Sequence, residues 1–255
     1  HNMKKRILVT GGTGYIGSHT VVELIENDYE VVIIDNLYNS DAETAKRIGK
    51  ITGTTPHLEV FDLCDGKKLN KFLDKTENIS AIIHFAAFKA VGESVNKPLD
   101  YYRNNLISLM NLLDAMIVHQ IPSIVFSSSC TVYGQPEKLP VTEHTPIQPA
   151  ISPYGNTKQI GEEIISDTIS ANHGLKAISL RYFNPIGAHP SGLIGELPRG
   201  VPENLVPFIT QTAIGIRNEL QVFGNDYNTP DGSCIRDYLH VVDLAKAHVA
   251  AVDRL

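Results

Sequence analysis

The chain has 255 residues, of which 42% are hydrophobic and 20% are charged, which is the composition of a globular protein with a sizeable buried core. Its formal net charge of −6 argues against nucleic-acid and anionic-membrane partners, so any bound phosphate has to be met by local groups. No apolar run approaches the ~18 residues that a membrane span needs, and no signal-peptide pattern precedes the first strand pattern.

The three cysteines, Cys64, Cys130 and Cys234, are far apart and match no metal-ligand spacing. We therefore predict reduced thiols, no bound metal and a cytoplasmic location. The first two residues, His1 and Asn2, precede a plausible start methionine and carry no weight in the fold prediction.

Apolar runs alternate with helical patterns through residue 182. Strands are predicted at 7–10, 30–35, 57–63, 81–87, 123–129 and 176–182. Helices fit between them, most clearly at 15–27, 98–119 and 153–172. Short strands that are apolar on both faces and separated by helices indicate a parallel sheet covered on both sides. We predict an α/β fold with the doubly wound sheet of a Rossmann dinucleotide-binding domain.

The pattern changes after residue 182. The segment 185–207 is rich in proline and glycine and predicts ordered loops with little secondary structure. We place a cofactor domain at 3–182 and the start of a smaller substrate-binding region at 183–255, interleaved with the first domain. The helical pattern at 241–255 stops without a capping residue or a return strand, which predicts a truncated C-terminal region.

A glycine-rich turn follows the first predicted strand and opens the first helix. Gly11, Gly14 and Gly17 are evenly spaced, with Tyr15 and Ile16 between the last two. The first glycine permits the tight turn, the second lets the backbone approach a diphosphate, and the third allows close helix packing. The helix N-terminus adds N–H donors and a positive dipole end. We predict that these five residues contact a dinucleotide, although any tight strand-to-helix turn can use glycines.

Asp35 ends the second predicted strand, at the point where a dinucleotide-binding fold places an acid. A carboxylate there accepts hydrogen bonds from ribose hydroxyls and repels a 2′-phosphate, which favours NAD over NADP. The alternative is a tight turn followed by a solvated acid.

Tyr154 and Lys158 form a Y-x-x-x-K pair at the start of a helix, so both side chains lie on one helical face. A tyrosine phenol has an ordinary pKa of about 10. A lysine and a nicotinamide cation nearby would favour the phenolate, which could then take a proton from a sugar hydroxyl. The alternative is an ordinary surface pair.

Ser127, Ser128 and Ser129 lie at the carboxyl end of the fifth predicted strand. A hydroxyl there can bridge the reacting oxygen and the tyrosine, and we assign this relay to Ser129. Which serine points inward stays open, because neighbours on a strand face opposite sides. A serine cluster at a strand end is otherwise an ordinary turn.

The spacing G-x-x-G-x-x-G at 11–17 resembles the extended short-chain dehydrogenase/reductase superfamily. This resemblance implies that Asp35 and Asn36 hold the adenosine ribose and that Asp62 and Leu63 flank the adenine. A carboxylate at the carboxyl end of a strand lies on the ligand-binding edge of such a sheet. For Asp62, a helix cap is the alternative.

Longer strings narrow the resemblance to one family. Residues 84–94, 127–134, 181–192, 223–227 and 236–238 closely resemble UDP-glucose 4-epimerases. The resemblance implies that the chain interconverts UDP-galactose and UDP-glucose, in galactose metabolism, by transient oxidation at sugar C4 with a tightly held NAD. It also implies a homodimer formed through the predicted helices at 98–119 and 153–172.

Carried over by position, Tyr154 is the base, Lys158 its activator and Ser129 the relay. The implied cofactor contacts, besides the tyrosine and the lysine, are Phe85, Ala86, Ala87, Lys89, Asn104, Ser127 and Phe183. The implied substrate contacts, besides the relay serine, are Asn184, Asn204, Leu205, Phe223 and Arg236. An arginine fork suits a diphosphate in an otherwise acidic protein.

Several of these residues have an ordinary structural alternative. Lys89 can be solvated, Phe183 can belong to the core, and Asn184 can close a turn. Arg236 can pair with Asp237 at the surface.

The residues after Ser129 favour oxidation and re-reduction at one carbon, and the chain departs from the family pattern at Cys130 and in its C-terminal region. No acid follows Ser129, whereas superfamily members that eliminate water or decarboxylate carry one there, and Cys130 stands where alanine is common. The family continues past Leu255 with another diphosphate-binding arginine and a residue that gates N-acetylated sugars. An epimerase for UDP-N-acetylhexosamine or UDP-pentose therefore stays open, as does a non-catalytic NAD-binding or sugar-nucleotide-sensing module.

Overall fold

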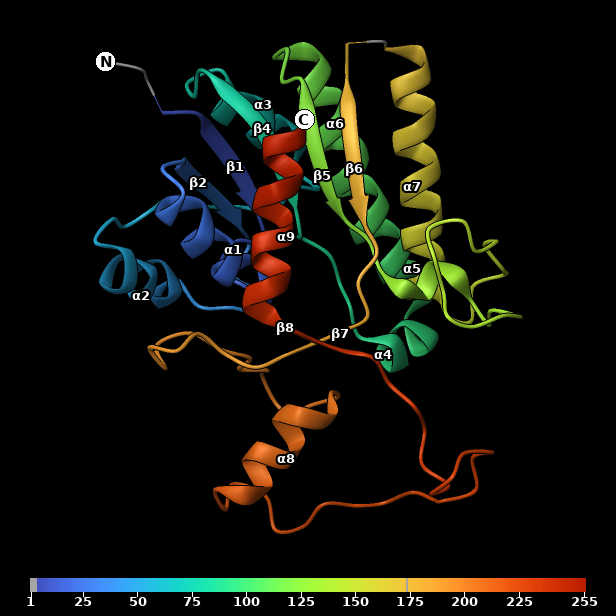
Figure 1. The fold of residues 1–255 in the computed structure, drawn as a ribbon. Helices are drawn as coiled ribbons and strands as arrows, with labels where there is room; N and C mark the ends of the chain where they lie inside the picture. Colours follow the sequence, from blue (N-terminus) through green and yellow to red (C-terminus); the bar gives the residue numbers. More distant parts are fainter. Residues whose placement is uncertain (1–3, 173) are drawn as a thin grey trace.

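The computed structural model describes residues 4–172 and 174–255. Its core is a parallel six-stranded sheet in the order β3-β2-β1-β4-β5-β6 (Figure 1). The strands are β1 (Arg6–Thr10), β2 (Glu30–Asp35), β3 (His57–Val60), β4 (Ile79–His84), β5 (Ser123–Ser127) and β6 (Lys176–Leu180). The order reverses between β1 and β4, the switch point at which such sheets bind ligands. The predicted doubly wound α/β fold is confirmed.

Four predicted strands run too far at their carboxyl ends. The observed ends are Val60 instead of 63 in β3, His84 instead of 87 in β4, Ser127 instead of 129 in β5, and Leu180 instead of 182 in β6. The apolar pattern continues past the ladder because side chains beyond the strand ends still reach the core. Leu63, for example, is only 4% exposed and packs in a core cluster, although its backbone has left β3.

Nine α-helices connect and flank the strands in the part of the chain that the structure describes. They are α1 (Tyr15–Glu26), α2 (Glu43–Thr52), α3 (Gly66–Leu73), α4 (Val91–Asn96), α5 (Pro98–Tyr102), α6 (Ser108–Val118), α7 (Pro153–Ala171), α8 (Leu205–Ala213) and α9 (Val241–Arg254). None of them, among residues 4–172 and 174–255, is long and apolar enough to cross a bilayer.

The predicted helix at 98–119 is interrupted by a wider π-helical turn. This turn, Arg103–Ile107, lies between α5 and α6. It holds Asn105, which is 6% exposed, with its side chain directed into the protein. The Asn105 amide accepts from Phe88 N at 2.8 Å and donates to Phe88 O at 3.0 Å and to Thr157 Oγ1 at 3.1 Å. Single π turns are often found at functional sites, and this one ties the segment after β4 to α7.

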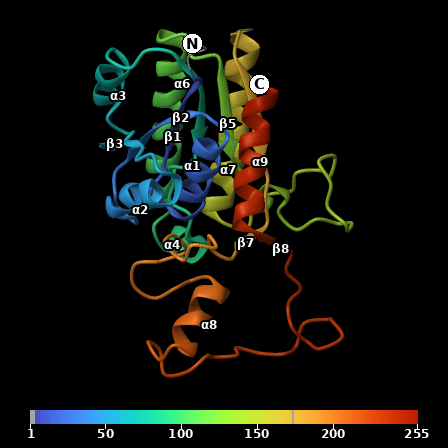
Figure 2. The same cartoon turned by 60° about the vertical axis from the view of Figure 1, so that its left-hand side comes forward.

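Helices cover both faces of the sheet (Figures 1 and 2). Neighbouring residues of a strand point to opposite faces, so in β1 Ile7 and Val9 join one core cluster and Leu8 joins the other. The first cluster includes side chains from α1, α2 and α9, and the second includes side chains from α3, α6 and α7. Each face of the sheet is therefore shielded from water.

Helix α9 returns to the main sheet after the segment 184–240, which leaves the sheet and is called the excursion below. It packs along α1, and Val249 and Val252 lie in the same cluster as Ile7 and Val9 of β1. The sheet of the predicted cofactor domain (3–182) is thus covered in part by residues from the predicted second region (183–255). The division at 182/183 itself stays a prediction.

The excursion lies beyond the carboxyl ends of the strands (Figure 1). It contains a short parallel pair, β7 (Asn184–Ile186) and β8 (Tyr238–His240), and helix α8. The prediction of little secondary structure at 185–207 is confirmed for residues 187–204, and only its two ends lie in β7 and α8. Pro207 is compatible with α8 because it stands in the first turn, where backbone N–H groups have no helical partner.

The core packing gives a stability prediction. Leu24 of α1 is 0% exposed and belongs to the cluster with β1. We expect Leu24→Ala to lower the free energy of unfolding by about 2–5 kcal/mol, because it removes buried apolar contacts and leaves a cavity. Chemical denaturation measures this change. The matched control is Leu197→Ala, since Leu197 is 72% exposed and should change the same quantity by less than about 0.5 kcal/mol. Equal effects of the two substitutions would contradict the packing described.

Candidate active site

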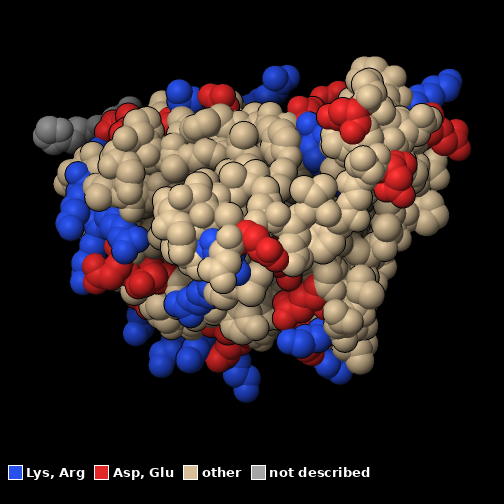
Figure 3. Space-filling view, turned by 90° about the horizontal axis from the view of Figure 1, so that it is seen from below, with Lys and Arg blue, Asp and Glu red and all other residues tan. Residues whose placement is uncertain are grey.

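The predicted site residues gather at the carboxyl edge of the sheet, the lower edge in Figure 1. Seen from below, this side is covered mostly by uncharged side chains, with charged groups interspersed chiefly toward its rim (Figure 3). The excursion lies on the same side of the sheet (Figure 1). The edge itself is formed by the ends of β1, β4 and β5 and by the starts of α1 and α7.

The glycine turn is packed too tightly for any side chain at two positions. A Cβ on Gly11 would lie 2.8 Å from Ala86 N, and a Cβ on Gly17 would lie 2.2 Å from Gly11 O. Gly14 is the N-cap of α1, so no side chain caps this helix, and its first turn holds no acid. The first N–H groups of α1 therefore remain donors at a positive helix end. This donor set fits the diphosphate of a dinucleotide.

Asp35 is a buried residue, at 8% exposed, so the alternative of a solvated acid is wrong. Its Oδ2 accepts from Thr13 N at 3.1 Å, and its Oδ1 accepts from Leu37 N at 2.9 Å and from Ser40 Oγ at 3.1 Å. The carboxylate therefore joins the glycine turn to the loop after β2. A carboxylate has about four acceptor positions, so these three bonds leave capacity for a ribose hydroxyl.

Lys158 is also a buried residue, at 6% exposed, so the alternative of a surface pair is wrong. Its Nζ donates to Ser127 O at 2.7 Å and lies 4.9 Å from the centroid of the Phe126 ring. The same atom lies 5.9 Å from the centroid of the Tyr154 ring. Burial lowers the pKa of Lys158 to about 8, and the charge of Glu162 acts in the opposite direction. The ammonium therefore loses its proton at a lower pH than an ordinary lysine does.

Tyr154 has a pKa above its ordinary value. Burial is the main cause, Tyr182 adds to it, and a hydrogen bond with Ser129 acts in the opposite direction. The protein alone therefore keeps the phenol neutral, and additional positive charge is needed to make it a base. Ser129 is 7% exposed, and its Oγ also accepts from Thr131 N at 3.2 Å.

The three serines at the carboxyl end of β5 have three different partners. Ser127 Oγ lies 2.5 Å from the hydroxyl of Tyr182, and Ser128 Oγ donates to Glu162 Oε1 at 2.5 Å. The third serine, Ser129, is the one that meets the phenol of Tyr154. Of the three, Ser129 is the serine that affects the pKa of Tyr154, and its role as the relay stays a prediction.

Two buried groups of the site have no counterpart in the sequence prediction. Burial raises the pKa of Tyr182 to about 12, and its hydroxyl holds Ser127. Glu162 receives Arg181 in a bidentate pair. Tyr182 was hidden in an apolar strand pattern. Glu162 stands four residues after Lys158, and this spacing was the available signal, because it places both on one helical face.

The residues predicted around the adenosine are spread over two loops. Asn36 and Asp62 are exposed, and each accepts a hydrogen bond from the backbone N–H two residues on, at 3.0 and 2.8 Å. Leu63 is a core residue. Asp62 is not a helix cap, because the N-cap of α3 is Asp65, whose side chain accepts from Lys68 N.

The segment after β4 lies beside the glycine turn. Phe85 N donates to Thr10 O at 3.0 Å, and the Phe85 ring packs on the ring of His248 in α9. Ala86 packs against the core, Ala87 is partly buried, and Lys89 is exposed, as its solvated alternative predicts.

Asn104, the remaining cofactor contact predicted before β5, lies in the π turn. Its Nδ2 donates to Asn105 Oδ1 at 3.0 Å. Its backbone carbonyl accepts from Cys64 Sγ at 3.7 Å. The amide is therefore held beside the inward-facing asparagine of the same turn.

The predicted substrate contacts are less closely gathered. Asn184 donates from both N and Nδ2 to Asp237 O, at 3.1 and 3.0 Å, so it joins β7 to the residue before β8. Phe183, just before it, is half-buried. Arg236 is exposed, and no ion pair joins it to Asp237 in the described structure. Burial raises the pKa of Cys130, and the charge of Arg236 is the smallest of the contributions that oppose this rise.

The other substrate residues lie on the excursion. Asn204 is exposed and donates to Glu196 Oε1 at 2.7 Å. Leu205 is 54% exposed and Phe223 is 95% exposed. The structure therefore does not bring these three side chains against Tyr154.

A model of the NAD dependent epimerase/dehydratase family matches residues 7–255. The chain belongs to this family. One relative, the UDP-glucose 4-epimerase of Dictyostelium discoideum, is 53% identical over 250 residues, which cover 98% of this chain and 72% of that protein.

Solved structures of similar proteins give the same picture. The UDP-glucose 4-epimerase of Bifidobacterium longum, in complex with NAD+ and UDP, has a TM-score of 0.95 and 47% identity, over 98% of this chain and 74% of that one. The enzyme of Stenotrophomonas maltophila, with bound NAD and formylated UDP-arabinopyranose, has a TM-score of 0.93 and 48% identity, over the same shares of both chains. The predicted family resemblance is confirmed.

In this family member, a buried histidine stands next to the site at the end of β4. His84 is 3% exposed, and its Nδ1 lies 2.7 Å from Thr10 Oγ1. Burial, and to a smaller extent the charge of Lys158, lowers the pKa of His84 to about 3. In the folded protein the imidazole side chain of His84 is therefore neutral.

We expect this imidazole to make stability fall with acid. Between pH 6.5 and 4 the unfolded chain takes up a proton at His84 and the folded chain does not, so the free energy of unfolding falls as the pH falls. In the His84→Asn variant this dependence should be weaker by about 1 kcal/mol per pH unit. Denaturation at several pH values measures the slope. His144→Asn is the control, because His144 is exposed and should leave the slope unchanged; identical slopes for wild type and His84→Asn would refute the interpretation.

Proposed function

We propose that this family member interconverts UDP-galactose and UDP-glucose by oxidising and re-reducing sugar C4 with NAD. The observation that carries the proposal is the convergence of Tyr154, Lys158 and Ser129 at the sheet edge. The names of the relatives, and the NAD present in both solved structures described above, support it. The glycine turn and Asp35 would hold the dinucleotide.

The proton chemistry follows from the residues at the edge. When bound, NAD would supply the acceptor and donor of the C4 hydride and a positive charge that favours the phenolate. Tyr154, as phenolate, takes the proton of the C4 hydroxyl through Ser129. The ammonium of Lys158 stabilises the phenolate by its positive charge. The loss of this proton and of the C4 hydride would give a 4-keto sugar, which then presents its other face and regains the hydride at C4 and the proton at the C4 oxygen.

The substrate anchors are proposed from position and chemistry. Arg236 makes one hydrogen bond, from Nη1 to Ile235 O, so most of its five donors remain for a diphosphate. Asn184 is the first residue of β7, and its side-chain amide donates to Asp237 O, next to Arg236 in the chain. We infer that these two residues hold the UDP portion. Asn204, Leu205 and Phe223 would join them only if the excursion closes on the substrate.

Because NAD is regenerated in every cycle, the protein needs no added cofactor. Protein expressed from its complete coding sequence should convert UDP-galactose to UDP-glucose when NAD has co-purified with it, as chromatography of both nucleotide sugars will show. UDP-N-acetylgalactosamine in a parallel reaction tests the wider substrate range. A preparation with confirmed NAD that leaves UDP-galactose unchanged would refute the proposed activity.

Removal of the phenol tests the assignment of the base. We expect Tyr154→Phe to lower kcat by about 10²–10⁴-fold, because general base catalysis contributes that much. The control is Tyr29→Phe, which removes a phenol that donates to Asp253 at the opposite edge of the sheet. A rate near that of the wild type in Tyr154→Phe would remove the tyrosine from the mechanism.

We also infer a cytoplasmic homodimer that acts in galactose metabolism, as the resemblance implies. Helices α5 and α6 expose large apolar side chains, namely Leu99 (61%), Met110 (43%), Ile117 (41%) and Val118 (69%). Such side chains on neighbouring helices are suited to a subunit interface. We expect sedimentation to give the mass of a dimer and Leu99→Glu to weaken the association, and a wild-type monomer at micromolar concentration would contradict this inference.

A further inference from the structure

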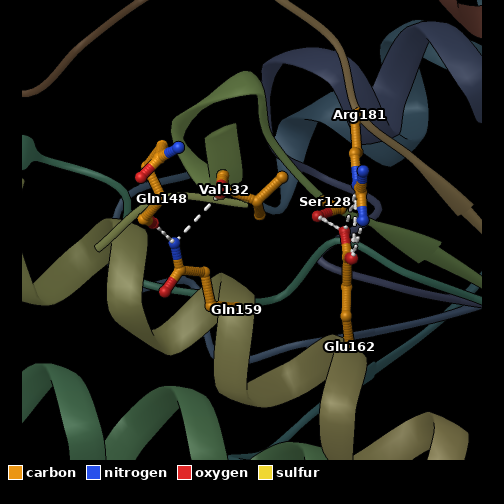
Figure 4. A network of polar contacts seen from close by, with 6 residues as sticks. All are labelled: Ser128, Val132, Gln148, Gln159, Glu162 and Arg181. Carbon is orange, nitrogen blue, oxygen red and sulfur yellow. Dashed lines mark hydrogen bonds and ion pairs between the residues drawn. The ribbon is translucent and has the colours of Figure 1, made fainter. Parts of the chain in front are cut away.

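A partly buried ion pair lies one helical turn beyond the tyrosine–lysine pair. Glu162 projects from α7 and is 13% exposed at its side chain. Arg181, just after β6, donates from Nε to Glu162 Oε1 at 3.0 Å and from Nη2 to Glu162 Oε2 at 2.5 Å. Ser128 Oγ donates to the same Oε1 at 2.5 Å. Figure 4 shows the carboxylate between the serine and the guanidinium.

The carboxylate therefore holds the middle residue of the serine triplet. Ser128 is 0% exposed, and its backbone N also donates to Leu180 O at 2.9 Å. On one side of it, Ser127 O accepts from the Lys158 ammonium at 2.7 Å. On the other side, Ser129 meets the phenol of Tyr154. A displacement of the middle residue would move both contacts.

Arg181 also contacts the segment that follows the serine triplet. Its guanidinium lies 5.0 Å from the ring centroid of Tyr133, in the 3-10 turn Cys130–Tyr133. Gln159 of α7 also binds this 3-10 turn. Its Nε2 donates to Val132 O at 2.9 Å and to Gln148 O at 2.7 Å (Figure 4). Polar groups of α7 thus bind the backbone on both sides of the strand end.

The charge of the pair is not required for packing alone. Replacing a buried ion pair by apolar residues of similar volume is often neutral or stabilising. A carboxylate at this position therefore calls for a role that an apolar side chain does not fill.

Such a role is to keep Lys158 protonated, because burial favours the neutral form of this lysine. Four other ionisable groups face it or its pair with Tyr154. His84 from β4 is neutral at pH 7, since its pKa is about 3, and Tyr182 is neutral because its pKa is about 12. Tyr101 and Cys130 have raised pKa values and are also neutral. Among the described residues, Glu162 is the anion whose charge favours the ammonium.

We propose that Glu162 is a positioning residue for the reaction at Tyr154: it fixes Ser128 between the two contacts of the site, and its negative charge keeps Lys158 protonated. This inference rests on the proposed function, since the proton transfer to Tyr154 gives both effects their purpose. Arg181 makes the buried carboxylate tolerable by pairing with it in a bidentate geometry.

The substitution Glu162→Gln removes the charge and keeps the length of the side chain. We expect the alkaline limb of the kcat–pH profile to move to lower pH by about one pH unit, because Lys158 then loses its proton more easily. The rate at the midpoint of the wild-type limb should fall about fivefold, because a pKa one unit lower takes the protonated fraction there from about a half to about a tenth. Glu163→Gln is the matched control, since Glu163 is the exposed neighbour on α7 and should leave the limb in place.

Two further variants separate charge from position. Glu162→Asp keeps the charge but draws it away from Ser128, so kcat should fall at every pH while the limb stays where it is. In Glu162→Gln/Arg181→Met no cation is left unpaired, so this protein should fold even where the single variant does not. It should show the same movement of the limb. A limb that returns to the wild-type pH in the double variant would assign the effect to the unpaired arginine and overturn the proposal.

A direct titration makes the test independent of the substrate. The ¹³Cε resonance of Lys158, assigned with Lys158→Arg, should titrate at lower pH in Glu162→Gln than in the wild type. If both the limb and this titration are unchanged while the wild type is active, Glu162 serves only packing and the inference fails. If the titration moves but the wild type does not act on UDP-galactose, the proposed function fails and the electrostatic role of Glu162 stands.

Discussion

The burial of one ammonium group sets the requirements for the rest of the site. An amine in a low-dielectric environment tends to lose its proton, and a hydrogen bond to a carbonyl offsets only part of that tendency. Lys158 meets this condition with Ser127 O and a nearby carboxylate. The strand end, the start of α7 and the segment after β6 therefore have to meet at one place. The doubly wound sheet provides it, because parallel strands end at the same edge.

The parts of the site that could be predicted from the sequence are those whose residues are close together in the chain. The glycine turn and the Y-x-x-x-K pair each lie within one short segment, and their geometry follows from a helix start and from helical spacing. Asp35 was predicted as a ligand residue, and the structure adds that it binds Thr13 and Ser40. Its contact with a ribose, like the other predicted ligand contacts, stays a prediction.

The parts that could not be predicted join residues far apart in the chain. Arg181 and Ser128 meet Glu162 from different strands, and Asn105 meets Thr157 from another helix. No pattern within a window of sequence encodes such pairs, because their proximity is created by the topology. The strand ends were overrun for a related reason, since apolar side chains continue into the core after the backbone has left the ladder. Fold class depends on repeated local patterns and was therefore the safer inference.

The return of α9 to the sheet has a consequence for how the chain reaches this structure. During synthesis the N-terminal side emerges first, with all six strands, and one face of the sheet stays partly uncovered until α9 (Val241–Arg254) leaves the ribosome. Helix α1 packs on that face, so its contacts with α9 form only after the excursion has been synthesised. In a nascent chain the exposed valines and isoleucines of this face would be a natural site for chaperone binding.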